Sequence, residues 1–163
     1  MKGIMRRAVF FLFAFALAWQ TGTGQTIELV NPAAGVRFDY PISYRILEQS
    51  QNTSGCNWFM TLLDGQDIVR INFTGNTFSE VAASEYFAHK RGKWLMEGKP
   101  AKLISRKTFK VLEGIRKNSD GNNIVVTLAF VENRNGCSAV LYAGSMKART
   151  ALYQIAKSFR FTR

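Results

Sequence analysis

The chain has 163 residues, of which 47% are hydrophobic and 13% aromatic, and it carries 22 Lys and Arg against 11 Asp and Glu. This composition supplies one folded domain and excludes a disordered chain, a collagen-like chain and a disulfide-dense miniprotein. A single His and two Cys also exclude a Cys₄ or Cys₂His₂ zinc site, and we expect no cofactor.

The first 24 residues have the pattern of a secretory signal peptide. Basic residues, the last of them Arg7, precede an apolar run at 8–19, and small residues follow it. This run suits the hydrophobic region of a signal, whereas a membrane-spanning helix needs about 20 residues. We therefore expect removal of 1–24 and a single domain at 25–163 in the periplasm or outside the cell. A retained N-terminal anchor is the alternative.

Export affects the interpretation of the two cysteines, Cys56 and Cys137. In an oxidising compartment a disulfide between them would persist. It would close a loop of 137 − 56 = 81 positions and stabilise the fold by about 3–4 kcal/mol. We predict this disulfide; the alternative is two separate thiols buried as small hydrophobic groups.

Strand patterns dominate the first half of the domain. Alternating apolar residues predict a strand at 36–40, which Pro41 ends, and a weaker strand at 44–48. The runs 57–63 and 66–74 flank an Asp-Gly pair, which is the strongest hairpin signal in the chain.

A helix is predicted next, over 77–98. Thr77 and Glu80 have the spacing of a capping box, and Gly98 marks the end. Gly92 is unfavourable inside a helix, so we expect the helix to bend or end there.

The remainder has β patterns and one more helix. Polar residues at alternate positions predict exposed or edge strands at 103–108 and 111–117, and the apolar run 123–131 predicts a central strand. A strand at 137–143, a helix at 146–157 and a short strand at 159–162 follow. Together these elements predict the α+β class, with a single mostly antiparallel sheet and two main helices.

Both ends of the domain resemble the PsbP-like family. Phe38-Asp39-Tyr40-Pro41 resembles that family's opening, and Leu141-Tyr142-Ala143-Gly144 with the later run 155–160 resembles its close. The resemblance implies a PsbP-like fold over most of 35–162. The family includes an extrinsic photosystem subunit, a Ran-binding nuclear-transport factor and bacterial exported proteins, which implies a binding or accessory module. It supplies no catalytic motif to carry over.

The residues for catalysis are few. On the predicted helix, His89 lies opposite Phe87, where Glu85 can pair with it at i, i+4. A Cys–His nucleophile using Cys56 or Cys137 conflicts with the expected disulfide. We therefore expect no enzyme and no metal site, and we keep a hydrolase as the least favoured alternative.

Positive charge is concentrated in one segment. Residues 25–88 carry 3 basic and 7 acidic side chains, residues 89–117 carry 10 and 2, and residues 118–163 carry 6 and 2. The net charge of the middle segment, +8, therefore equals the net charge of the whole domain, because −4 + 8 + 4 = +8. Its cations, which we call the basic segment, are Lys90, Arg91, Lys93, Lys99, Lys102, Arg106, Lys107, Lys110, Arg116 and Lys117.

We predict that the basic segment contacts an acidic surface of another envelope or secreted protein. Two alternatives stay open. One is a carrier or sensor of an anionic lipid or amphiphile held between the sheet and a helix, or contact with an anionic membrane surface. The other is a solvated face that keeps a basic protein soluble. We expect a monomer, and we expect no nucleic-acid partner because we expect the protein to be exported.

Overall fold

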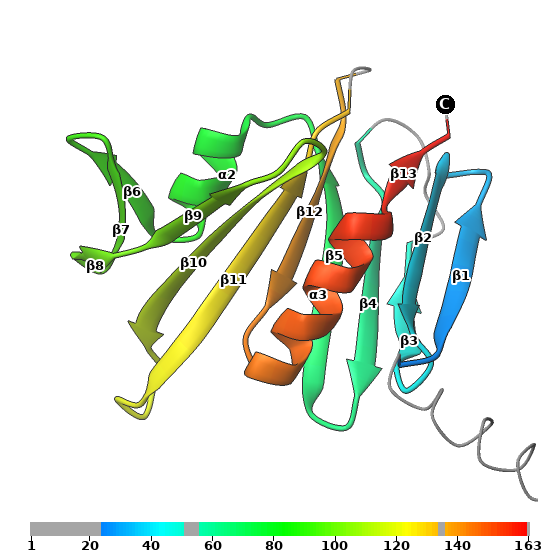
Figure 1. Ribbon diagram of the computed structural model, residues 1–163, viewed down its shortest axis with the longest axis horizontal. Helices are drawn as coiled ribbons and strands as arrows, with labels where there is room; N and C mark the ends of the chain where they lie inside the picture. Colours follow the sequence, from blue (N-terminus) through cyan, green and yellow to red (C-terminus); the bar gives the residue numbers. More distant parts are fainter. Residues whose placement is uncertain (1–23, 51–55, 134–135, 163) are drawn as a thin grey trace, which may run out of the picture.

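The computed structural model describes residues 24–50, 56–133 and 136–162. A seven-stranded sheet, antiparallel at every pairing, forms its centre (Figure 1). In order across the sheet, the strands are β3 (Arg45–Gln49), β4 (Phe59–Asp64), β5 (Asp67–Thr74), β12 (Ser138–Ala143), β11 (Asn123–Val131), β10 (Phe109–Lys117) and β9 (Lys102–Ser105). The predicted signal peptide lies outside the described residues apart from Gly24.

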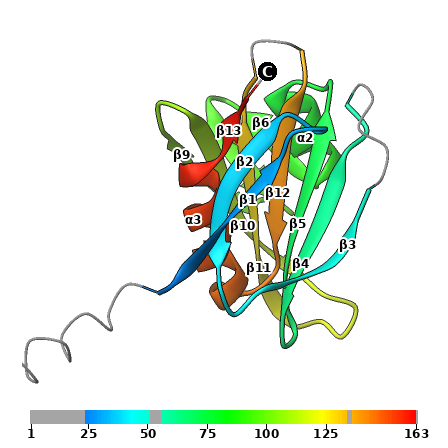
Figure 2. The same cartoon turned by 90° about the vertical axis from the view of Figure 1, so that its right-hand side faces the viewer.

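Each face of this sheet is covered by one helix and one small sheet. On the first face lie α3 (Met146–Ser158) and the three strands β1 (Thr26–Asn31), β2 (Val36–Pro41) and β13 (Arg160–Phe161). On the second face lie α2 (Phe78–Ser84) and the strands β6 (Phe87–Lys90), β7 (Lys93–Met96) and β8 (Lys99–Pro100). Figure 2 shows the two helices on opposite sides of the large sheet. The predicted α+β class is confirmed.

The hydrophobic core consists of two clusters, one on each face of the large sheet, because the central strands are apolar on both faces. On β11, Leu128 and Phe130 join the cluster under α2, while Ala129 and Val131 join the cluster under α3. All four are buried, and the predicted central position of residues 123–131 is confirmed.

The predicted helix at 77–98 is wrong beyond its first two turns. Its capping box is present, since the Thr77 N–H donates to Glu80 Oε2 at 2.7 Å, but α2 ends at Ser84. Residues 87–100 instead form the three-stranded sheet β6–β7–β8. Paired positive φ values at Arg91–Gly92 (51° and 76°) and at the following turn, Glu97–Gly98 (47° and 77°), fit type I′ hairpin turns. Because these two turns reverse the chain direction, apolar residues predicted to lie on one face of a helix are buried in strands instead.

Two further strand predictions differ from the structure. The predicted edge strand at 111–117 is an interior strand: β10 lies between β9 and β11, with Leu112 and Gly114 buried. The edge on this side of the sheet is β9, and β3 forms the opposite edge. Residues 26–31 carry no predicted strand, yet β1 forms there because it pairs along its whole length with β2.

The predicted disulfide is confirmed. Cys56 and Cys137 are bonded, with their Cα atoms 5.5 Å apart. The bond ties the segment before β4 to the segment before β12, and these strands are separated in the sheet by β5.

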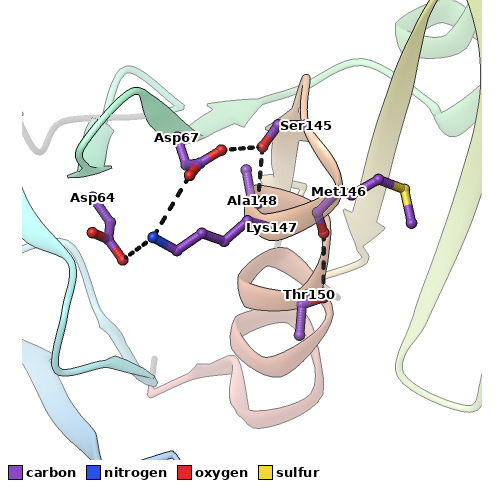
Figure 3. A network of polar contacts seen from close by, with 7 residues as sticks. All are labelled: Asp64, Asp67, Ser145, Met146, Lys147, Ala148 and Thr150. Carbon is purple, nitrogen blue, oxygen red and sulfur yellow. Dashed lines mark hydrogen bonds and ion pairs between the residues drawn. The ribbon is translucent and has the colours of Figure 1, made fainter.

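A polar network fixes the start of α3 against the hairpin between β4 and β5 (Figure 3). Ser145 caps α3, accepting from the Ala148 N–H at 3.0 Å, and its hydroxyl donates to Asp67. Lys147 Nζ lies 2.9 Å from Asp64 Oδ2 and 3.7 Å from Asp67 Oδ2. A hydrogen bond from Ser43 and one from Lys147 hold the pKa of Asp64 below its usual value of 3.8. The carboxylates that flank the Asp-Gly turn therefore orient the second helix.

We expect loss of the disulfide to lower the free energy of unfolding by about 3–4 kcal/mol, since the open chain regains the entropy of an 81-residue loop. Urea unfolding of the variant Cys56→Ser/Cys137→Ser measures this. Dithiothreitol should lower the midpoint of the wild type towards that of the variant and leave the variant unchanged. A loss below about 1 kcal/mol would contradict the expectation.

Gly114 should be the residue of β10 least tolerant of a side chain. A Cβ there would lie 2.8 Å from Met96 Cβ and 2.9 Å from Phe87 Cε1, so β6 and β7 would have to move. We expect Gly114→Ala to lower the free energy of unfolding by about 1–3 kcal/mol. The control is Gly144→Ala, where nothing lies within 4 Å of the added Cβ. Equal stabilities of the two variants in urea would show that this hairpin does not pack on β10.

The Asp64 contacts should make stability depend on acid pH. Because the folded state lowers the pKa of Asp64, its contribution is present above pH 4 and is lost as the pH falls through the lowered value. Asp64→Asn should therefore differ from wild type at pH 7, and the difference should shrink towards pH 2. The measurement is the urea midpoint of both proteins at several pH values. Parallel curves for the two proteins would overturn the role given to Asp64.

Candidate functional site

An open cleft lies where the β9–β10 connection meets the end of α3. Its volume is about 600 Å³. Three cations of the basic segment line it, and β13 adds a fourth. These are Arg106, Lys107, Lys110 and Arg160. We call this the basic cleft.

The β9–β10 turn positions the first three cations. The Arg106 N–H donates to the carbonyl of Phe109 at 2.8 Å, which closes a tight turn and leaves Arg106 and Lys107 exposed at its tip. Lys110 lies on β10 with its Nζ 5.4 Å from the centre of the Phe78 ring, a cation–π contact with α2.

Arg160 comes from a distant part of the sequence. It follows α3, and its Nη1 donates to the carbonyls of Lys157 and Phe159 at 3.0 and 2.6 Å. A cation at this position complements the negative end of the helix dipole. Sequence reasoning missed Arg160, because only the pairing of β13 with β2 brings it towards the β9–β10 turn.

Charge and aromatic surface combine in the cleft. Four cations and one carboxylate, Glu132, line it, which gives a formal charge of 4 − 1 = +3. Phe109, Phe130 and Phe161 lie behind these charges, and Phe161 is partly exposed. Such a site favours an acidic partner whose stem or neighbouring groups are apolar.

The basic segment does not form one patch. Lys90 pairs across the hairpin with Lys93, on either side of the Arg91 turn. Most of the others lie along β8, β9 and the far end of β10, namely Lys99, Lys102 and Lys117. The Lys117 N–H donates to Glu97 Oε2 at 3.2 Å. Arg116 faces a different pocket. Only the three residues at the β9–β10 turn therefore share the basic cleft.

The structure weakens the catalytic alternative. His89 lies on β6, exposed, with its ring centre 4.9 Å from that of Trp94 across the hairpin. It therefore shares a strand face with Phe87, contrary to the helical prediction. Both cysteines are in the disulfide, so neither can be a thiolate nucleophile. In the described part of the chain, no cluster of three His, Cys, Asp or Glu is placed to hold a metal.

The space predicted for an amphiphile, between the sheet and a helix, is filled. Ile71 and Leu141 of the sheet and Leu152 and Ile155 of α3 are all fully buried in one cluster. An amphiphile would therefore have to bind in an open cleft. Within the described residues, no helix is long and apolar enough to cross a membrane.

No protein-family model and no curated protein matches the sequence. Solved structures match the fold. The chain superposes on the Saccharomyces cerevisiae Ran-binding protein Mog1p with a TM-score of 0.54 at 6% identity, over 86% of this chain and 97% of that one. A Bacteroides thetaiotaomicron protein gives 0.53 at 10% identity, over 83% of this chain. This chain spans about half of that protein, 48% of its length.

Cyanobacterial PsbP from Synechocystis gives a TM-score of 0.45 at 10% identity, over 87% of this chain and 95% of that one. The domain has the PsbP-like fold, as the resemblance at its two ends predicted. These identities are low, so the likeness establishes the fold and leaves the function to be argued from the site.

Proposed function

We propose that this protein is an exported, non-catalytic module that binds an acidic surface of another envelope or secreted protein through the basic cleft. The observation that carries the proposal is the meeting of Arg106, Lys107 and Lys110 with Arg160 around one open cleft of formal charge +3. Mog1p, which shares the fold, is named as a Ran-binding protein, and this supports a binding role for the scaffold. The disulfide and the predicted signal peptide support export.

The cleft is suited to protein contact by its composition. Exposed cations at the tip of a hydrogen-bonded turn attract an acidic partner and orient it, while aromatic side chains behind them provide apolar contact area. Arginine also offers paired N–H groups to a carboxylate. Binding of this kind depends on salt, because solvent-exposed charges are screened.

Charge reversal at the turn tests the proposal. A fluorescent hexaglutamate peptide should bind the protein more tightly at 50 mM than at 300 mM salt. Arg106→Glu/Lys107→Glu should weaken this binding at least 10-fold, about 1.4 kcal/mol. Fluorescence anisotropy measures it. The matched control is Lys90→Glu/Lys93→Glu, which changes the net charge equally at the hairpin tip, outside the cleft.

The control distinguishes weakening caused by the loss of cations in the basic cleft from weakening caused by the change in net charge. Equal weakening by both double variants would show that the peptide responds to overall charge, and would contradict the proposal. Vesicles containing phosphatidylglycerol provide the second comparison. Binding to these vesicles without binding to the peptide would replace the proposed protein partner with an anionic membrane surface.

A further inference from the structure

A second pocket lies on the face of the sheet that α2 leaves partly uncovered. Its volume is about 340 Å³. Glu85 at the end of α2 and Gly144 after β12 contribute to it, and strands β5, β10, β11 and β12 contribute the rest. It shares no lining residue with the basic cleft. We call it the arginine pocket, after Arg70 and Arg116.

Arg116 lines this pocket with one of its donors, the Nε–H, unsatisfied. Its Nε is buried and has no hydrogen-bond partner in the described chain. No carboxylate lies within 4.0 Å of its guanidinium nitrogens among the described residues. A buried donor without an acceptor is unfavourable, and the cost is larger when the donor belongs to a charged group. A bound acceptor would remove this cost.

The aromatic ring of Tyr86 lies against the guanidinium of Arg116. The Tyr86 ring centre lies 5.7 Å from Arg116 Cζ. This tyrosine has a φ of 66°, a left-handed conformation that is rare for a bulky residue, and 67% of its surface is exposed. Strained residues of this kind are concentrated at functional sites. Here the strain places an aromatic ring over an arginine that lines a pocket.

A second arginine and a phenol face the same pocket. Arg70 on β5 lies directly across from Tyr142 on β12, and both line the cavity. Within the described residues, Arg70 also has no carboxylate within 4.0 Å. Burial and the nearby Glu85 raise the pKa of Tyr142 to about 12, so its hydroxyl remains a donor at neutral pH.

The rest of the lining restricts the charge and the apolar character of a ligand that the arginine pocket can hold. Ile68, Ile124 and Val126 supply an apolar surface between the polar groups. The formal charge of the lining is 2 − 1 = +1, from two arginines and Glu85. One negative charge on the ligand balances it. Paired arginine donors match the geometry of a carboxylate, and the apolar surface matches a short aliphatic chain.

We propose that the arginine pocket binds a single carboxylate carried on a short aliphatic chain, with Arg116 and Arg70 as its cationic ligands and Tyr86 as the residue that positions Arg116. The carboxylate can belong to a free aliphatic acid or to the C-terminus of a peptide that ends in an apolar residue. This site is independent of the basic cleft and of the function proposed for that cleft.

Nuclear magnetic resonance of the isotope-labelled protein tests the proposal. Hexanoate should shift the Arg116 Nε–Hε resonance and the methyl resonances of Ile68 and Ile124, whereas hexanamide, its uncharged analogue, should not. Arg116→Lys keeps the charge but removes the paired donors, and should weaken hexanoate binding at least 5-fold. Tyr86→Leu should weaken it while leaving the net charge unchanged. The matched control is Arg45→Lys, the same substitution at an exposed position on β3 outside both pockets, and it should bind as the wild type does.

A second arm separates the two sources of the carboxylate. The peptide Gly-Ser-Val-Leu is titrated with a free C-terminus and with an amidated one. Binding of the free peptide more tightly than hexanoate identifies a protein terminus as the source, and the reverse order identifies a free acid. The proposal is overturned if neither probe shifts these resonances, if hexanamide shifts them as hexanoate does, or if Arg45→Lys reduces binding as much as Arg116→Lys.

Discussion

The structure depends on burying both faces of its central strands. β10, β11 and β12 carry large apolar side chains on alternate sides, so each face needs its own cover. α3 and the β1–β2–β13 sheet cover the first face and share a continuous buried cluster with it. α2 and the β6–β7–β8 sheet cover only part of the second face. Gly114 allows this second cover to pack closely on β10, since Met96 and Phe87 occupy the space of its missing side chain.

Both candidate sites lie where the covers end. The basic cleft forms at the end of the sheet where β13 leaves α3 and meets the β9–β10 turn. The arginine pocket forms where α2 ends and the chain turns sharply through Tyr86 into β6. The interior that would have held an enclosed amphiphile is filled by side chains. Both candidate sites are therefore open clefts at the surface rather than an enclosed cavity.

Several elements could be predicted from local patterns, and others depend on distant contacts. The Asp64–Gly65 hairpin, the apolar strand β11 and the α3 helix have local signals that agree with their surroundings. The segment 86–98 has no such unambiguous local signal. Its apolar residues, spaced as at positions 83, 87 and 94, fit one face of a helix as well as paired strands, and only the turns at Gly92 and Gly98 distinguish the two structures. Arg160, Arg70 and Tyr142 carried no signal as site residues, since their neighbours in space come from distant strands.

Amide hydrogen exchange of the wild-type protein tests the unequal covering of the sheet most directly. The account predicts slow exchange for β11 amides at Leu128–Phe130, which lie under both covers, and faster exchange at Ile124–Val126, beside the arginine pocket. It also predicts protection of the amides that join β6 to β7, such as those of the Ala88–Leu95 pair. Uniform protection along β11, together with exchange in 86–98 that follows a continuous helix, would contradict it.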